Sequence, residues 1–354
     1  MTLAVRPPVS PMLAKLTREL PTGDGWAYEP KWDGFRCIVF RDGDDVVLGS
    51  RNEKPMERYF PEILGPLRDV LPDQAVVDGE LVIATEHGLD FEMLSQRIHP
   101  AESRINKLAG EWPVSFVAFD LLAADNDDLR TSPFSERRAR LEQIVGAGND
   151  SVHLTPLTTD PTVAEQWFER FEGAGLDGVV AKRLDESYQE NKRTMAKVKH
   201  LRTADFVVAG YRTHKDGNGV GSLLLGLFDD AGDLHHVGVA SSFAAPMRKQ
   251  LKDEIADLEK DASVGHPWGE WANAQENLGQ MPGAGNRWNA KKDMSWTPLR
   301  IERVAEVAYE HLQGDRFRHT ARFQRWRPDR EPSSCTYEQL ESPVPIELKE
   351  VFGV

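Results

Sequence analysis

Short runs rich in β-branched and aromatic residues alternate with clusters of Gly, Asp and Pro through the first 120 residues of this 354-residue chain. Such runs predict strands, and the clusters predict the turns between them. The expected strands are Trp26–Lys31, Arg36–Phe40, Val46–Ser50, Ala75–Ile83 and Val114–Leu122. The expected helices are Pro61–Val70, Phe91–Ile98, Ser135–Val145 and Thr162–Ala174. Because these helices do not alternate regularly with the strands, antiparallel sheets with flanking helices are favoured over a parallel βαβ sheet.

The pattern changes near Arg202. Three strands joined by turns are expected after it, followed by a helix, a long Gly/Trp/Asn-rich loop to about Trp296 and a further strand. These elements are Phe206–Tyr211, Ser222–Asp229, Leu234–Ala240, Ala245–Lys260 and Ile301–His311. A meander, a helix and more strands are compatible with an OB-fold β-barrel. We therefore expect an α+β chain with a first domain at 1–202, an OB-fold domain at 203–335 and a C-terminal tail at 336–354.

Composition excludes several classes of protein. With 40% hydrophobic and 28% charged residues, the chain can form packed cores, so disorder is not expected. No apolar run approaches the roughly 20 residues of a membrane helix, and the Pro-rich start lacks the apolar stretch of a secretory signal. The two cysteines, Cys37 and Cys335, lack metal-ligand spacing, which is typical of a reducing cytosol. We expect a cytoplasmic protein with no membrane partner.

The formal net charge of −14 argues at first against a nucleic-acid partner, because phosphate binding needs Lys and Arg. The distribution of charge matters more than its sum. Seven Lys or Arg lie between Asn191 and Lys215 against one Asp, and six Arg lie between His311 and Arg330 against two Asp. Both zones suit ordinary solvated surfaces as well as anion-binding ones, and composition alone leaves the two interpretations open.

The first candidate for chemistry is Lys31-Trp32-Asp33-Gly34-Phe35-Arg36. A Lys-x-Asp-Gly sequence occurs by chance in about one in ten chains of this length, so alone it also suits a strand that ends in a turn. A free lysine is neutral in roughly a few molecules per ten thousand at about pH 7. A nucleophilic lysine therefore needs burial, a neighbouring cation or a metal. Arg36 is a nearby cation, and Gly34 would let the backbone turn or approach a ligand closely.

Further segments follow Lys31 in order, and together they resemble the ATP-dependent DNA ligases of the covalent nucleotidyltransferase superfamily. The likeness runs from Pro11 to about Asp329. Its segments are Lys31–Arg36, Ser50-Arg51-Asn52, Asp78-Gly79-Glu80-Leu81, Phe116–Leu122, Asp177–Lys182, Lys197-Val198-Lys199 and Arg318–Asp329. Within the family, the chain looks like the small bacterial ligases of the LigC type, which are related to the ligase module of LigD. The resemblance implies an adenylation (nucleotidyltransferase) domain followed by the OB-fold domain.

The resemblance also implies a role for each segment. Lys31 would carry AMP, and Phe119 would stack on adenine. The other residues expected to bind the nucleotide are Glu29 (adenine amino group), Arg36, Arg51 (nucleotide, then nick phosphate), Glu80 (ribose or metal), and Lys197 and Lys199 (α-phosphate). The residues expected to face pyrophosphate or DNA are Arg318, Arg322, Arg325 and Arg327.

Position 177 departs from the family's pattern, which has Glu before Gly-Val-Val where this chain has Asp177. Asp keeps the charge but is one methylene shorter, so its reach to a metal ion changes. Because Mg²⁺ often keeps its waters, Asp177 could act through one. The implied metal ligands are Asp177 and Glu80, for Mg²⁺ or Mn²⁺.

The implied activity is sealing of 5′-phosphate/3′-hydroxyl nicks in duplex DNA, with ATP, through lysyl-AMP and an adenylated 5′-phosphate. Nicked or gapped DNA would be the substrate in repair at the nucleoid, alongside a primase-polymerase or another repair partner. An RNA ligase or GTP-using capping enzyme is one alternative, because it shares the Lys-x-Asp-Gly core. A non-catalytic nucleic-acid-binding protein that kept the fold is another. No Gly-x-x-x-x-Gly-Lys-[Ser/Thr] sequence occurs, which excludes a P-loop.

Overall fold

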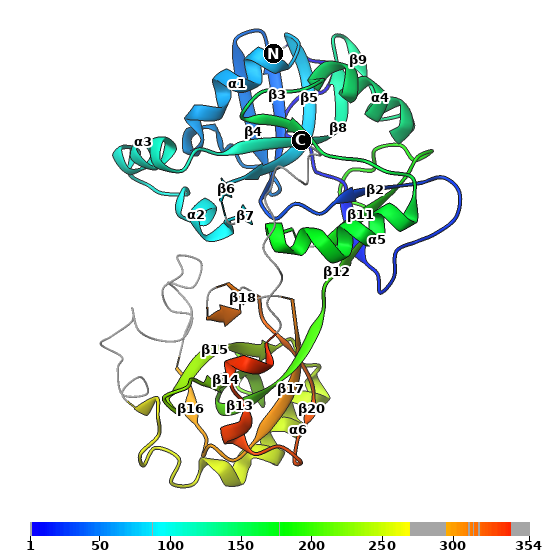
Figure 1. The fold of residues 1–354 in the computed structure, drawn as a ribbon. Coiled ribbons are helices and arrows are strands. Elements are labelled where there is room, and N and C mark those ends of the chain that lie inside the picture. Colours follow the sequence, from blue (N-terminus) through cyan, green and yellow to red (C-terminus); the bar gives the residue numbers. More distant parts are fainter. Residues whose placement is uncertain are drawn as a thin grey trace. The chain divides into compact units, whose positions relative to one another are not determined.

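The computed structural model describes residues 2–86, 88–176, 178–269, 295–310, 312–313, 315–317 and 319–340. Two compact units make up the chain, and the first ends at Lys199 where the second begins at His200. The boundary expected from the sequence, between residues 202 and 203, lies three residues later. Figure 1 shows the strands and helices of each unit. None of the described helices has the length and apolarity needed to span a bilayer.

A six-stranded sheet forms the centre of the first unit, in the order β10-β8-β5-β3-β4 with β9 on the edge of β8. Its strands are β3 (Phe35–Asp42), β4 (Asp45–Ser50), β5 (Gln74–Val82), β8 (Ser115–Ala124), β9 (Asp127–Asp128) and β10 (Val152–Leu154). Neighbours along this order are antiparallel except β10, which is parallel to β8. The expected antiparallel sheet is thereby confirmed.

Both faces of this sheet are buried, and the alternation of side chains in β3 shows how. Cys37 and Val39 pack into one core cluster, whereas Ile38 and Phe40 pack into another. Successive side chains of a strand point to opposite faces, so one continuous apolar run supplies both cores. The second cluster includes Met195, which belongs to the other sheet of the unit.

That other sheet has four strands in the order β1-β12-β11-β2. They are β1 (Leu13–Leu16), β2 (Trp26–Pro30), β11 (Gly178–Arg183) and β12 (Arg193–Lys199). β1 runs parallel to β12, and the other pairs are antiparallel. Only β2 was expected as a strand from the sequence.

Helices cover the outer parts of the first unit (Figure 1). They are α1 (Leu64–Val70), α2 (Phe91–Gln96), α3 (Glu102–Glu111), α4 (Phe134–Val145) and α5 (Pro161–Arg170), with 3-10 turns η1 (Glu57–Tyr59), η2 (Pro61–Ile63) and η3 (Phe171–Ala174) and a short hairpin β6 (Ala84–Thr85) and β7 (Gly88–Leu89). α5 begins where Asp160 accepts a hydrogen bond from the Thr162 amide, as an N-cap residue does. Helix α3, whose Ile105 and Leu108 are buried, was not predicted from the sequence.

The second unit is a bent sheet in the order β15-β14-β13-β17-β20, with β16 on β13. Its elements are β13 (Arg202–Thr213), β14 (Val220–Phe228), β15 (Leu234–Ser241), α6 (Ala245–Ile255), η4 (Ala256–Glu259), β16 (Thr297–Pro298), β17 (Val304–Tyr309), β18 (Leu312–Gln313), β19 (Arg316–Phe317), β20 (Arg322–Trp326), η6 (Pro332–Ser334) and η7 (Tyr337–Gln339). The expected meander, helix and later strand are all present. Most of the expected loop before Trp296 and most of the expected tail lie outside the described residues.

The two edges of this sheet meet at a single point. Ala240 in β15 forms an isolated parallel bridge with Ala321, just before β20. The Ala321 amide donates to the Val239 carbonyl at 2.9 Å, and the Ser241 amide donates to Ala321 at 3.2 Å. The expected OB-fold is therefore confirmed, and within the described residues its six-stranded sheet is not a fully closed barrel.

Candidate functional site

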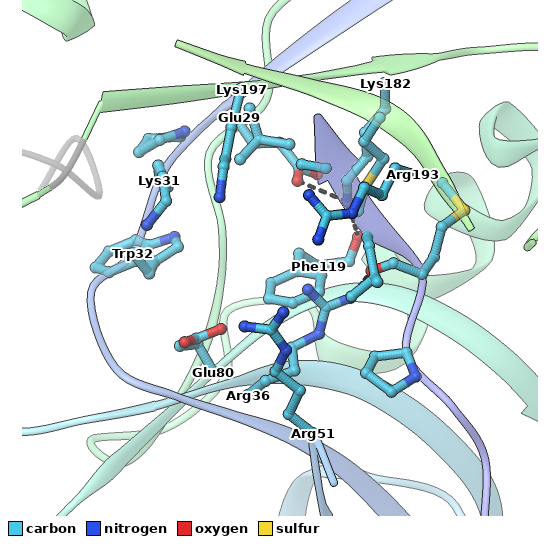
Figure 2. A pocket seen from close by; sticks show the side chains of 17 residues that line it. Glu29, Lys31, Trp32, Arg36, Arg51, Glu80, Phe119, Lys182, Arg193 and Lys197 are labelled. Atoms are coloured by element: carbon cyan, nitrogen blue, oxygen red, sulfur yellow. Dashed lines mark hydrogen bonds and ion pairs between the residues drawn. The ribbon is translucent and has the colours of Figure 1, made fainter. Parts of the chain in front are cut away.

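A cavity of about 260 Å³ lies in the first unit, and its walls come from both sheets of that unit. Seven candidate residues from the sequence analysis line it together: Glu29, Lys31, Arg36, Arg51, Glu80, Phe119 and Lys197. These residues follow or belong to β2, β3, β4, β5, β8 and β12, so distant segments converge here (Figure 2). The volume is near the lower end of the roughly 300–1,000 Å³ typical of ligand pockets.

The lining is strongly cationic. Among the described residues that line the cavity, the cations are Lys31, Arg36, Arg51, Lys182, Arg193 and Lys197, and the acids are Glu29 and Glu80. Lysine and arginine side chains supply several N–H donors and no acceptor. A cavity with this excess of positive charge suits a ligand that carries several negative charges, such as a polyphosphate.

Lys31 follows the last residue of β2, and its side chain faces the cavity (Figure 2). Its amide donates to the Gly178 carbonyl of β11 at 2.8 Å. The next residue, Trp32, is buried, and its indole Nε1 donates to the Thr155 hydroxyl at 2.8 Å. The backbone on both sides of the Lys31 side chain is therefore anchored.

Gly34 is required by close packing. A Cβ atom added there would lie 2.1 Å from the Leu81 carbonyl oxygen of β5 and 2.9 Å from Cγ of Glu80. The backbone at Gly34 thus makes a close approach to strand β5. This contact packs the start of β3 directly against the strand that carries Glu80.

Glu80 points into the cavity from β5 (Figure 2). Burial raises the pKa of Glu80 to about 7, while Arg36, Lys31 and a hydrogen bond from the Gly34 amide act in the opposite direction. The carboxyl group therefore changes charge close to neutral pH, and a cation bound beside it would favour the ionised form.

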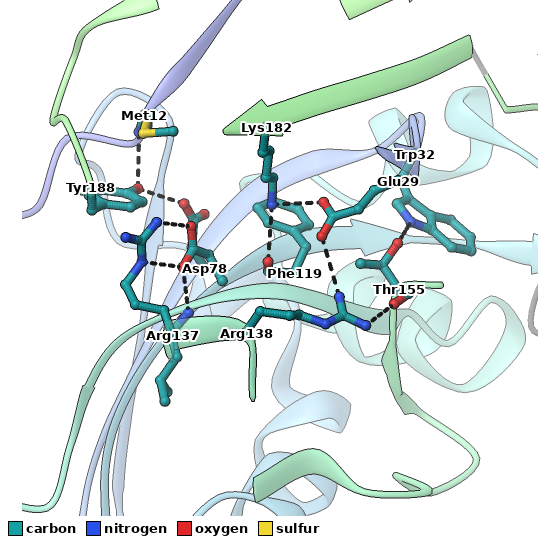
Figure 3. Close-up of polar contacts among 12 residues, drawn as sticks. Met12, Glu29, Trp32, Asp78, Phe119, Arg137, Arg138, Thr155, Lys182 and Tyr188 are labelled. Atoms are coloured by element: carbon teal, nitrogen blue, oxygen red, sulfur yellow. Dashed lines mark hydrogen bonds and ion pairs between the residues drawn. The ribbon is translucent and has the colours of Figure 1, made fainter. Parts of the chain in front are cut away.

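Arg36 is held from beneath by a buried network. Its guanidinium forms two hydrogen bonds of 2.6 Å with Asp78, whose exposed fraction is 0%, and one of 3.3 Å with the Met12 carbonyl. The Tyr188 hydroxyl donates to Asp78 at 2.6 Å and accepts from the Met12 amide at 3.0 Å (Figure 3). Asp78 raises the pKa of Arg36 against the effect of burial. Arg36 is a fixed positive charge on the cavity floor.

The Phe119 ring lies against two of the cavity's cations. The Arg36 guanidinium carbon is 4.5 Å from the ring centroid and the Lys182 Nζ is 4.8 Å from it. Phe119 is 8% exposed, so a small part of the ring faces the cavity. A planar ligand group would meet Phe119 at this part.

Glu29 is bound at both carboxylate oxygens. Lys182 Nζ lies 2.7 Å from Oε2, and Arg138 Nη1 of α4 lies 3.3 Å from Oε1 (Figure 3). Lys182 also donates to the Phe119 carbonyl at 3.0 Å, and Arg138 donates to the Thr155 carbonyl at 2.7 Å. Burial raises the pKa of Glu29, while Lys182 and Arg138 lower it.

Lys199 and Asp177 stand apart from the other candidates of the first unit. Lys199 is not among the described residues that line the cavity. It shares a face of β12 with Lys197, but at a rise of about 3.3 Å per residue it lies roughly 7 Å further along the strand. Asp177 lies outside the described residues, so its expected metal contact is not placed. The described residues contain no group of three or more His, Cys, Asp or Glu suited to a metal ion.

In the second unit, Arg322 and Arg325 of β20 and Arg327, which follows this strand, differ in their contacts. Arg322 is exposed, and Arg325 is 60% exposed while it pairs with Glu306 at 2.7 Å. Arg327 instead forms bonds of 2.8 and 3.0 Å with Asp205 and of 2.6 and 2.9 Å with Asp329. Its guanidinium is thus engaged within its own unit, in contrast to the open phosphate contact expected. Arg318 lies outside the described part of the chain.

Lys182, Arg193 and Arg138 were not predicted from the sequence. Lys182 follows the apolar run Gly178-Val179-Val180-Ala181 in β11, and a cation directly after such a run was the available signal. Arg138 carries no local signal, because its partner Glu29 lies more than 100 residues away along the chain.

Comparisons with known proteins place the chain in a family. A model of the ATP dependent DNA ligase domain matches residues 11–199, and a model of the ATP dependent DNA ligase C terminal region matches residues 216–330. The chain is 54% identical to DNA ligase C of Mycobacterium tuberculosis over 356 residues, which cover 99% of each protein. It is also similar to the multifunctional non-homologous end joining DNA repair protein LigD of the same organism. The two are 32% identical over 243 residues, and these residues cover 67% of this chain and 30% of LigD.

Among solved structures, one from a study of Lig E DNA ligases covers 90% of this chain and 100% of its own, with a TM-score of 0.56 and 17% identity. That likeness concerns the fold. The family models, which match segments of both units, and the full-length relative identify the family. The chain belongs to the ATP-dependent DNA ligases.

Proposed function

We propose that Lys31 is the nucleophile that carries AMP and that the cavity around it is the ATP site. The observation that supports this most is the convergence of Lys31 with five further cations and two carboxylates in one cavity of a single unit. Nucleotidyl transfer depends mainly on positioning and on neutralising charge around phosphorus. This cavity offers both.

The base and the phosphates would occupy different parts of the cavity. Phe119 stacks on adenine through the part of its ring that faces the cavity, and Glu29 accepts a hydrogen bond from the adenine amino group. Lys197, with Lys199 further along the same face of β12, and Arg51 contact the phosphates. Arg36, held by Asp78, supplies a fixed charge close to Glu80 and the ribose.

In the first step, Lys31 Nζ attacks the α-phosphorus, the bond to the bridging oxygen breaks, and pyrophosphate leaves. In the second step, the 5′-phosphate at the nick takes the AMP and frees Lys31. In the third step, the 3′-hydroxyl attacks the adenylated phosphate, a phosphodiester forms and AMP leaves. Arg51 then contacts the nick phosphate.

Mg²⁺ (or Mn²⁺) is the metal proposed for this site. The residues fit it, because Mg²⁺ prefers oxygen ligands and is often bound through one or two carboxylates plus substrate phosphates. Glu80 supplies such a carboxylate in the cavity, and Asp177 is proposed as the second. When bound, the metal would neutralise charge that develops on the phosphates.

Partners and location complete the proposal. Nicked or gapped duplex DNA is the proposed substrate, in repair at the nucleoid in the cytoplasm, alongside a primase-polymerase or another repair protein. The exposed Arg322 and Arg325, and Arg318, are proposed to face pyrophosphate or DNA. Arg327 would support them by holding β20 to Asp205.

The test of Lys31 uses two substrates. Lys31→Ala should abolish transfer of label from α-labelled ATP to the protein, whereas the same change at the exposed Lys107 should leave labelling unchanged. Lys31→Ala should still seal a nick whose 5′-phosphate already carries AMP, because that step does not use the lysine. Labelling that persists without Lys31 would refute the assignment.

A further inference from the structure

The Glu29 carboxylate is clamped between two cations from different elements, Lys182 of β11 and Arg138 of α4. We propose that this clamp determines nucleotide specificity: Lys182 and Arg138 are positioning residues that hold Glu29 as a charged, acceptor-only group and so select a purine with a 6-amino group. The inference rests on the proposed function, in which Glu29 contacts the base.

The contacts of the Glu29 carboxylate leave it able to accept a hydrogen bond from the cavity. Val180 of β11 is paired with Glu29 of β2. Lys182, two residues after Val180, is therefore a diagonal neighbour of Glu29 on the same face of the sheet. Lys182 approaches Oε2 at 2.7 Å and Arg138 approaches Oε1 at 3.3 Å. Each oxygen accepts one bond from the protein and keeps further acceptor capacity. Because Glu29 also lines the cavity, that capacity is available to a ligand.

The charge of Glu29 decides what such a ligand can be. An ionised carboxylate only accepts hydrogen bonds, whereas a protonated one also donates. Adenine offers a donor at position 6, and a 6-oxopurine offers an acceptor there. Ionised Glu29 therefore favours the amino group of adenine and repels the oxygen of a 6-oxopurine. Protonated Glu29 loses this preference.

Glu29 and Lys182 are each only 3% exposed, so the clamp works against a large penalty for burying charge. The charged groups that act on Glu29 are Lys182 and Arg138, which lower its pKa, and Asp120, which raises it together with burial. Without Lys182, Arg138 at 3.3 Å would be the remaining cation of the clamp. Burial and Asp120 would then favour protonated Glu29.

The experiment compares ATP with ITP, whose base has an oxygen at position 6 and a hydrogen on N1, where adenine has an amino group and an unprotonated nitrogen. The full chain is labelled from α-labelled ATP or ITP over a range of concentrations, and the ratio of the two labelling efficiencies is measured from pH 6 to pH 9. The wild-type ratio should be roughly 10 to 150, the range that a hydrogen bond to a charged group contributes. A ratio within one variant is independent of how much of that variant is folded.

Lys182→Met keeps much of the side chain's volume and removes its charge. We expect the ratio to fall about fivefold or more near pH 7 and to recover as the pH rises, since deprotonation restores the acceptor. Lys182→Arg should keep a ratio close to that of the wild type. Lys107→Met, which makes the same change at a side chain that is 70% exposed, should leave the ratio unchanged.

Glu29→Gln provides a second route to the same result, because its amide presents either a donor or an acceptor. Its ratio should also fall, and adding Lys182→Met should lower it no further. An unchanged ratio in Lys182→Met, with both nucleotides used less well, would overturn the inference and assign Lys182 a structural role only. A wild-type ratio near one would overturn the inference while the proposed function stands. No labelling of the wild type by either nucleotide would overturn both.

Discussion

The Tyr188 hydroxyl offers a one-atom test of the network beneath the cavity. It donates to the fully buried Asp78 at 2.6 Å and accepts from the Met12 amide at 3.0 Å. Tyr188→Phe removes both bonds, although Arg36 keeps Asp78 partnered. A hydrogen bond to a charged group contributes about 1.5–3 kcal/mol, and a buried amide without an acceptor costs about 1–3 kcal/mol. We expect the first unit to lose roughly 2–4 kcal/mol of its free energy of unfolding.

The assay is urea unfolding of the whole chain, followed by tryptophan fluorescence and by circular dichroism, so that separate transitions of the two units are recognised. The labelling reaction should also show a higher KM for ATP, because Arg36 lies against Phe119 and loses part of its support. Tyr59→Phe is the matched control: this half-buried tyrosine has no hydroxyl hydrogen bond within the described structure. A loss below about 1 kcal/mol, or one equal to that of the control, would refute the reasoning.

Three further predictions follow from the site and from β20. Burial raises the pKa of Glu80 to about 7, so the protonated carboxyl stabilises the fold fully below about pH 4.5. This stability is lost as the pH rises through 7, by up to about 3 kcal/mol. Glu80→Gln should flatten this part of the stability–pH curve, and a curve unchanged from that of the wild type would contradict the prediction. Gly34→Ala would place a Cβ 2.1 Å from a carbonyl of β5 and should cost at least about 3 kcal/mol in urea unfolding, whereas Gly65→Ala, with nothing within 4 Å, should be neutral or stabilising. Arg327→Gln should destabilise the second unit by about 2 kcal/mol in thermal unfolding, whereas Arg322→Gln should leave stability within about 0.5 kcal/mol and weaken binding to nicked DNA in a salt titration; equal stability of the two variants would count against this division of roles.

Particular residues show how far the sequence reached into the site. The sequence alone predicts seven residues that line one cavity: Glu29, Lys31, Arg36, Arg51, Glu80, Phe119 and Lys197. Their order along the chain carried that information. The strand that bears Arg36 and the one that bears Glu80 were also expected, since both contain continuous runs of β-forming residues.

Other residues could not be reached in this way. β11 and β12 were not expected, and with them the pairing that brings Lys182 beside Glu29 was missed. Arg137 and Arg138 are adjacent in α4, yet the first binds Asp120 and the second binds Glu29. Arg327 sits in a segment that resembles a phosphate-binding one, but Asp205 engages it. The contacts of Arg138 with Glu29 and of Arg327 with Asp205 each join residues more than 100 positions apart in sequence.

The sequence by itself determined the family, the order of the chemical groups and the alternation of strands and turns, because each depends on residue types at short spacing. The tertiary structure decided which charges meet. It placed Arg138 and Lys182 on Glu29, Asp78 and Tyr188 beneath Arg36, and Gly34 against β5. The physical reason is that the charge and the position of a buried group depend on its neighbours in space. Strand pairing and helix packing between segments that are separate in sequence select those neighbours.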